Sequence, residues 1–183
     1  MKPDEEEFRR FVAARMERLR GVAYLTCGDW QIAEDAVSTC LAKLYVRWGK
    51  VNSPDRYAAR MVMRAVIDES RRPWRREWSA SDAMPEVAVP DASEAVTEAM
   101  RVRHALRRLP PGQRAVLVLR FYADFSVEET AAALGRRPGT VTSQTVRGLT
   151  TLRRLLAAQD IDLIEQPEEG ESGARHAGNL VDG

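Results

Sequence analysis

Arginines and aromatic rings are interleaved over a short stretch in the first half of the chain. Tyr57, Arg60, Arg64, Arg71, Arg72, Trp74, Arg75, Arg76 and Trp78 all fall between residues 57 and 78. Guanidinium groups hold phosphates, and aromatic rings stack on unpaired bases for about 1–3 kcal/mol each. The stretch therefore predicts contact with single-stranded nucleic acid. A solvated basic helix end whose tryptophans pack in the core is the alternative.

A second set of polar side chains lies in the stretch GRRPGTVTSQTVRGLTTLRRLL, residues 135–156. Arg136 and Arg137 stand at an expected turn, where they can touch phosphates, and the amides of the following helix start also favour a phosphate. Thr142, Ser143 and Gln144 offer short hydrogen bonds and one amide able to pair with adenine. Arginines further along, at 147, 153 and 154, extend the positive strip.

The elements around this stretch predict a helix-turn-helix. Ser126 and Glu129 have the spacing of a capping box, and Gly135 ends the helix that they begin. A second helix is expected from Pro138 or Gly139 to about Leu156, with Val141, Val146, Leu149, Leu152 and Leu156 on its buried face. In a helix-turn-helix, the second helix enters the major groove. A plain helical hairpin would share this spacing.

Residues suited to catalysis or metal binding are scarce. His104 and His176 are the only histidines, and Cys27 and Cys40 stand apart from each other and from any histidine. The sequence has no phosphate-cradling glycine loop, metal cluster or nucleophile–base arrangement. We therefore expect no catalytic residue, no metal site, no cofactor and no enzymatic activity, and we expect both cysteines to be free thiols.

The net charge of +1 conceals a strong segregation of charge along the chain. Residues 1–79 carry net +4, whereas residues 80–98 carry five acidic and no basic side chains. Residues 99–158 carry 11 basic and three acidic side chains, net +8, and residues 159–183 carry net −6. Basic blocks suggest polyanion binding, and this balance favours DNA binding by the helix-turn-helix. With no long apolar run and a charged N-terminus, the expected location is the cytoplasm.

Helical periodicity is widespread and strand signals are nearly absent, which predicts an all-α fold. Three helices are expected before residue 73, the third from Asp55 to about Arg72, and a helix from Asp91 or Ser93 to Leu109 precedes a short one at 113–122. We expect two small helical domains joined by a flexible acidic linker, the second ending in the helix-turn-helix. The predicted boundaries are 1–78, linker 79–98, second domain 99–158, and an acidic tail, 159–183, expected to be disordered.

Three segments, in this order, resemble the sigma-70 family of RNA polymerase sigma factors. GDWQIAEDAVSTCLAKLYVRW at 28–48 resembles the polymerase-binding helix, and PDRYAARMVMRAVIDESRRPWRRE at 54–77 resembles the promoter-melting helix and loop. LRRLPPGQRAVLVLRFYADFSVEETAAALGRRPGTVTSQTVRGLTTLRRLL at 106–156 resembles the second DNA-binding domain. The size is that of the extracytoplasmic-function (ECF) group, particularly its actinobacterial-type members, and the resemblance covers about residues 6–157.

The resemblance implies a sigma factor that binds core RNA polymerase, directs it to promoters and assists promoter melting. Its implied partners are core polymerase, promoter DNA and, as a candidate, an anti-sigma protein, with no membrane insertion. The residues implied to dock on polymerase are Asp35, Ser38, Leu41, Lys43, Leu44 and Arg47. The −10 element would be held by Tyr57, Arg60, Arg64, Arg71, Arg72, Trp74, Arg75 and Arg76. The −35 element would be held by Arg120, Tyr122, Arg136, Arg137, Thr140, Thr142, Ser143, Gln144 and Arg147.

This sequence departs from the family pattern at a few positions. The family usually has Asn near the position of Arg64, and Lys and Arg at the positions of Thr142 and Gln144. A helix-turn-helix regulator that acts without being a polymerase subunit is the main alternative, but it leaves the 60–78 segment and the acidic linker without a task. A helical adaptor that binds only protein leaves the +8 block unexplained.

Overall fold

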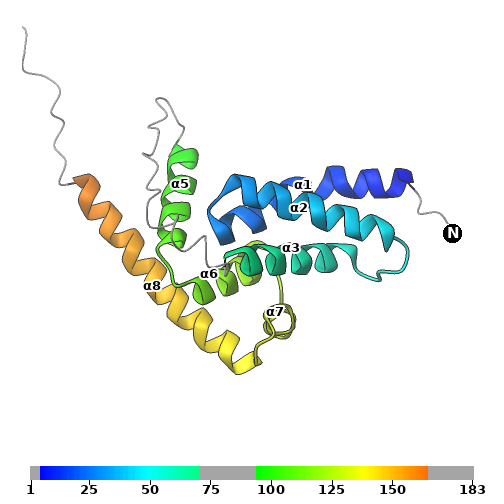
Figure 1. The fold of residues 1–183 in the computed structure, drawn as a ribbon. Coiled ribbons are helices and arrows are strands. Elements are labelled where there is room, and N and C mark those ends of the chain that lie inside the picture. Colours follow the sequence, from blue (N-terminus) through cyan, green and yellow to red (C-terminus); the bar gives the residue numbers. More distant parts are fainter. Residues whose placement is uncertain (1–4, 71–93, 165–183) are drawn as a thin grey trace, which may run out of the picture.

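The computed structural model describes residues 5–70 and 94–164, and side chains are described within residues 5–70 and 98–159. Every regular element in these ranges is helical, with no strand there, which confirms the expected all-α class (Figure 1). None of the described helices is long and apolar enough to cross a membrane.

The N-terminal part is a three-helix unit of α1 (Glu5–Cys27), α2 (Trp30–Val46) and α3 (Pro54–Ser70). Asp29 caps α2 by accepting a hydrogen bond from the amide of Ile32 at 3.0 Å. Apolar residues at helical spacing from all three helices form one core, in which Val22, Leu44 and Val62 are fully buried. Trp48 packs edge-on against Phe8, with ring centroids 5.1 Å apart, so this tryptophan belongs to the packed interior.

The C-terminal part comprises α5 (Glu94–Arg107), α6 (Pro111–Leu117), the π-helical turn η1 (Val118–Tyr122), α7 (Val127–Leu134) and α8 (Pro138–Ile164). The predicted helix at 113–122 is thus an α-helix that widens into a π turn. The turn is closed by the amide of Ala123, which donates to the carbonyl of Val118 at 3.0 Å. Single π turns inside helices often occur at functional sites.

Helix α5 begins at Glu94, close to the expected start at Asp91 or Ser93, whereas α8 continues past its expected end near Leu156 to Ile164. The continuation has a simple cause, because residues 157–164 contain no Gly or Pro and include the strong helix former Ala twice. Residues 71–93 and 165–183 lie outside the described residues, and with them most of the predicted linker and tail.

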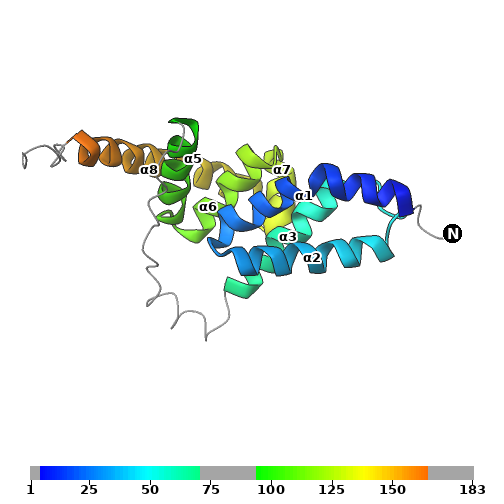
Figure 2. The same cartoon turned by 90° about the horizontal axis from the view of Figure 1, so that it is seen from above.

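The two helical parts pack against each other. Figures 1 and 2 show α6, η1 and α7 between the first three helices and α8. Helix α1 contacts α5, α6 and η1, and α3 contacts α7. Ala115, Val118, Leu119 and Phe125 from the C-terminal part join the hydrophobic core of the N-terminal part. The described structure is therefore a closed arrangement of the two parts.

Candidate nucleic-acid interface

The first helix of the helix-turn-helix begins and ends at the residues that the sequence predicts. The Ser126 hydroxyl accepts from the amide of Glu129 at 3.0 Å, and the Glu129 carboxylate accepts from the amide of Ser126 at 2.7 Å. This capping box satisfies two amides that lack partners within the helix. Gly135 ends α7 in the left-handed conformation, with φ of 62°, which glycine adopts without steric cost. Val116, Ala131 and Val141 then bury the contact between α6, α7 and α8.

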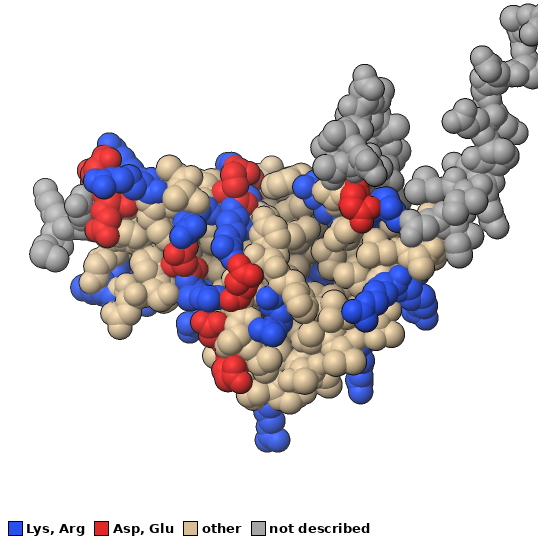
Figure 3. All heavy atoms as spheres, turned by 180° about the vertical axis from the view of Figure 1, so that it is seen from behind, with Lys and Arg blue, Asp and Glu red and all other residues tan. Residues whose placement is uncertain are grey.

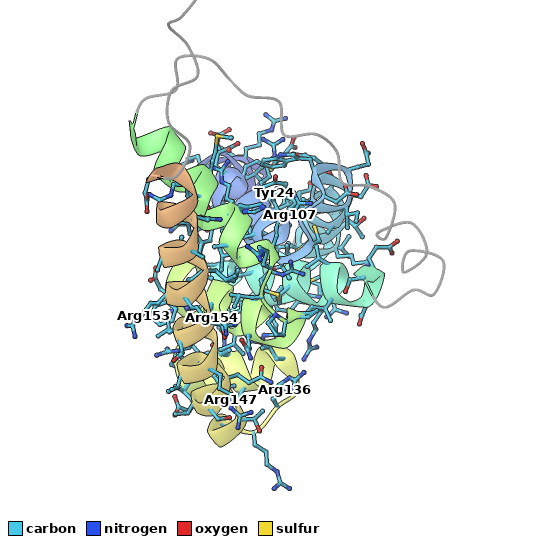
Figure 4. All side chains as sticks on the ribbon, turned by 90° about the vertical axis from the view of Figure 1, so that its left-hand side faces the viewer. Tyr24, Arg107, Arg136, Arg147, Arg153 and Arg154 are labelled. Atoms are coloured by element: carbon cyan, nitrogen blue, oxygen red, sulfur yellow. The ribbon has the colours of Figure 1, made fainter. Side chains whose placement is uncertain are left out.

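The turn and the outer side of α8 are open to solvent. Arg136 and Arg137 are exposed in the turn, and Thr142, Ser143 and Arg147 are exposed on the first turns of α8, whereas Thr140 is half-buried. Figure 4 shows Arg136 and Arg147 near the N-terminal end of α8, with Arg153 and Arg154 further along the same helix. Positive side chains thus lie in the turn before α8 and further along α8, and the exposed residues between them, Thr142 and Ser143, are uncharged.

The predicted buried face of α8 is found at Val141, Leu149 and Leu152, but two other side chains lie differently from the expectation. Gln144, expected to read bases, has its Oε1 atom buried and lies against Gly112 at the start of α6. Val146, expected to face the core, is 61% exposed. Gly148 lies on the side of α8 that faces α6, because a Cβ there would lie 3.2 Å from Leu117, so the two helices meet closely at this glycine.

Arg120 and Tyr122 lie in η1. Arg120 donates through Nη1 to the carbonyl of Phe125, which ties the guanidinium to its own turn. Tyr122 covers Gly21 of α1, where any side chain would collide with the phenol ring. In this closed arrangement neither residue is part of the exposed face of α8.

A basic hollow lies where α2 turns into α3. It has a volume of about 720 Å³ and is lined by residues that include Arg47, Lys50, Arg56, Tyr57 and Arg60. Arg47 donates to the Tyr57 hydroxyl at 3.1 Å, which fixes the ring at the wall of the hollow. The hollow is thus lined by cations and one aromatic ring, which are the side-chain types that bind a phosphate and stack on an unpaired base. Sequence reasoning missed Lys50 and Arg56, although Arg56 continues the four-residue spacing of Arg60 and Arg64.

The remaining residues predicted to hold the −10 element do not line this hollow. Arg64 donates to the carbonyls of Ala133 and Ala132, at 3.2 and 3.4 Å, near the C-terminal end of α7. These carbonyls have no partner within the helix, and a cation there also suits the helix dipole. Arg64 therefore connects the N-terminal part to the C-terminal part by hydrogen bonds in this structure. Arg71, Arg72, Trp74, Arg75 and Arg76 lie outside the described residues.

Arg56 makes the densest set of contacts between the parts. Its Nη1 atom donates to the carbonyl of Asp124 at 2.7 Å, its Nε atom lies 3.3 Å from a Glu129 carboxylate oxygen, and its guanidinium stacks 4.8 Å from the Phe125 ring centre. Arg18 adds an ion pair with the Asp124 carboxylate at 2.6 Å. Figure 3 shows basic and acidic side chains interspersed on this side of the molecule, with basic side chains projecting from the helix-turn-helix end.

Of the residues predicted to dock on polymerase, two are corrected. Leu41 is 8% exposed and Leu44 is fully buried in the core between α1, α2 and α3, so neither offers a docking surface. Their spacing places them on the apolar stripe of α2. The polar members of the set, Asp35, Ser38, Lys43 and Arg47, are exposed.

The chain matches two family models. Residues 11–76 match sigma-70 region 2, and residues 99–152 match sigma-70 region 4. The first match covers most of the three-helix unit with the basic hollow, and the second covers most of the C-terminal part, including the helix-turn-helix. The region 2 match therefore corresponds to the N-terminal part of the fold, and the region 4 match corresponds to the C-terminal part.

Relatives match over most of the chain. RNA polymerase sigma-E factor of Streptomyces coelicolor is 36% identical over 160 residues, which cover 85% of this chain and 89% of that protein. ECF RNA polymerase sigma factor SigM of Mycobacterium tuberculosis is 29% identical, over 84% of this chain and 79% of the relative.

Solved structures share the fold. The sigma factor RpoE from Bartonella quintana, solved in complex with the anti-sigma factor NepR, matches with a TM-score of 0.68 and 22% identity, over 83% of this chain and 98% of that one. CnrH, solved in complex with the cytosolic domain of CnrY, matches with a TM-score of 0.60 and 22% identity, over 85% and 90%. Together with the relatives and the two matched regions, these structures place the chain: it belongs to the sigma-70 family, as a member of the ECF group of RNA polymerase sigma factors.

Proposed function

We propose a division of tasks between the two parts of this sigma factor, which binds core RNA polymerase and directs it to promoters in transcription initiation. The C-terminal part takes the −35 duplex through α8 and the turn before it. The N-terminal part takes core polymerase on the exposed side of α2 and the unpaired −10 strand at α3. The observation that carries the proposal is the open, positively flanked first half of α8, within a region-4 match.

The basic hollow supports the −10 assignment. A single-stranded nucleotide needs a cation for its phosphate and a ring for its base, and Arg60 and Tyr57 supply both beside Arg47 and Lys50. Melting by such a site draws on the binding energy of flipped bases rather than on bond chemistry. The expectations that this chain is not itself an enzyme and that it acts in the cytoplasm remain predictions.

Reconstitution tests the function directly. Purified full-length chain is added to core polymerase free of other sigma factors, and transcripts are mapped on genomic fragments. Defined start sites that depend on the chain support the proposal. Core polymerase that gains no start-site preference contradicts it, and duplex binding by the chain alone would then favour a helix-turn-helix regulator.

The turn arginines give a quantitative test. Removing one phosphate-binding cation should reduce the salt dependence of duplex binding, the slope of log K against log salt, by about 0.9. We expect Arg136→Ala and Arg137→Ala each to reduce this slope by about one charge for the holoenzyme on an upstream duplex. Arg9→Ala, at the far end of α1 in a pair with Glu5, is the matched control and should leave it unchanged. An unchanged slope in the turn variants excludes these arginines as phosphate ligands.

We also propose an anti-sigma protein as a partner, because RpoE was solved with the anti-sigma factor NepR and CnrH was solved with the cytosolic domain of CnrY. An apolar groove of about 730 Å³ runs between α1, α5, η1 and α8, with Trp30 and Phe121 exposed in its wall. A genomic library screened for genes that silence sigma-dependent transcription would supply the partner. Trp30→Ala with Phe121→Ala should restore transcription in its presence, and continued silencing would exclude the groove.

A further inference from the structure

The outer face of α8 carries three branched side chains spaced four residues apart. Thr142, Val146 and Thr150 are all exposed, and Val146 is 61% exposed in the middle of the row. The opposite side of the helix packs against the rest of the protein. Val141 is fully buried on that side, and Gly148 closely contacts Leu117 there. We call Thr142, Val146 and Thr150 the methyl strip.

The hydroxyl groups of the strip are turned back onto the helix. Thr142 Oγ1 donates to the carbonyl of Pro138 at 3.2 Å, and Thr150 Oγ1 donates to the carbonyl of Val146 at 2.9 Å. Ser143, beside the strip, likewise donates to Thr140 at 3.0 Å. These hydroxyl hydrogens are therefore already used, and the γ-methyl groups of the two threonines join the two methyl groups of Val146 as the apolar groups of this face.

Few other groups on this face can read a base edge by hydrogen bonding. Gln144, which carries the one side-chain amide in the first turns of α8, lies against Gly112 instead. Arg147 is exposed next to Val146, and Arg136 and Arg137 are exposed in the turn before α8. The centre of the exposed face is thus apolar, and its cations lie around it.

In B-DNA the major groove presents one apolar group, the C5-methyl of thymine, and apolar side chains recognise it by contact. Neighbours in the strip lie about 6 Å apart along the helix axis, a spacing of one to two base pairs. We propose that the methyl strip, with Val146 at its centre, reads thymines of the −35 duplex through their C5-methyl groups. This inference rests on the proposed placement of α8 on that duplex.

Deoxyuridine tests the proposal, because it pairs as thymidine does and lacks only the methyl group. Holoenzyme made from the full chain first selects preferred upstream elements from a randomised promoter library. Affinity is then measured on the selected promoter with thymidine or deoxyuridine in that element alone. We expect deoxyuridine to weaken wild-type binding about fourfold, the equivalent of one buried methyl group. Val146→Ala should bind the thymidine promoter less tightly and show no difference between the two promoters.

Two controls accompany the measurement. Val12→Ala makes the same chemical change at a half-buried valine in α1, outside both proposed binding surfaces, and should keep the wild-type ratio between the two promoters. Deoxyuridine placed only in the spacer should also leave wild-type affinity unchanged. Thr142→Ser removes one methyl group while keeping the hydroxyl, and should lower the ratio without abolishing it.

The failures are distinguishable. Selection that yields no upstream preference overturns the placement of α8 on the −35 duplex, and the methyl reading with it. A clear upstream preference with equal affinity for thymidine and deoxyuridine overturns the methyl reading alone. A difference that Val146→Ala retains also overturns it, because the methyl groups would then be read by other residues.

Discussion

Burial decides the chemistry of Cys40. Its thiol is 2% exposed and donates to the carbonyl of Ala58 at 3.4 Å, in the core between α2 and α3. Burial raises the pKa of this thiol from 9.0 to about 11, because the thiolate would lose its hydration there. Burial also raises the pKa of Cys27, which is half-buried. Both thiols therefore stay protonated, and poor nucleophiles, at neutral pH.

This shift predicts a pH dependence of stability. Below pH 9 the Cys40 thiol is protonated in both the folded and the unfolded chain, so its contribution is fully present. Between pH 9 and 11 only the unfolded chain loses the proton, so the free energy of unfolding should fall by up to about 2–3 kcal/mol. Urea unfolding at a series of pH values measures this. Cys40→Ala should show a shallower fall, and identical profiles would contradict the assignment.

The capping box makes a prediction for α7. Ser126→Ala removes the side-chain acceptor for the amide of Glu129, and loss of such a cap costs about 1 kcal/mol. We expect a decrease of this size in the free energy of unfolding by urea. Ser38→Ala makes the same change at an exposed position inside α2, where alanine is the better helix former, and should not destabilise the chain. Equal effects of the two substitutions would show that the cap is energetically silent.

Local patterns predicted the helices well because local chemistry determines their ends. Ser126 with Glu129, Gly135 and Pro138 fixed both helices of the helix-turn-helix. The exposure of Val146 was beyond such patterns, because the side of α8 that packs depends on the contact of Gly148 with Leu117, a residue of another helix. Gln144 was expected outside but is half-buried with its Oε1 atom covered, and Val146 was expected inside but is 61% exposed.

Local sequence patterns likewise could not predict which residues pair across the two parts of the protein. No sequence spacing links Arg56 to Asp124, or Arg18 to Asp124, because the partners lie far apart in the chain. The sequence predicted two domains and a linker, and the contact between the domains emerged only in three dimensions. The same contact explains why Arg64, predicted for DNA, is bound to carbonyl groups of α7 here.

At the scale of the whole molecule, the proposed placement of α3 on the −10 strand and α8 on the −35 duplex does not fit the closed arrangement. Elements centred near −10 and −35 are about 25 base pairs apart, or about 85 Å at 3.4 Å per pair. Here α3 touches α7, with Arg64 Nε 3.2 Å from the Ala133 carbonyl oxygen. On the proposed assignment, the two surfaces have to separate before both elements can be held, and the contacts of Arg56 and Arg64 have to break.

This conclusion predicts that weakening those contacts opens the free protein. We expect Arg56→Ala combined with Arg64→Ala to raise the radius of gyration measured by small-angle X-ray scattering, because each arginine provides hydrogen bonds worth about 1 kcal/mol to the closed form. Arg60→Ala removes the exposed arginine between them on α3 and is the matched control. If the double variant stays as compact as the wild type, the shared apolar core around Val118, Leu119 and Phe125 holds the parts together without the arginines. In that case Phe125→Ala should open the molecule instead, because it removes both that core contact and the ring beneath Arg56.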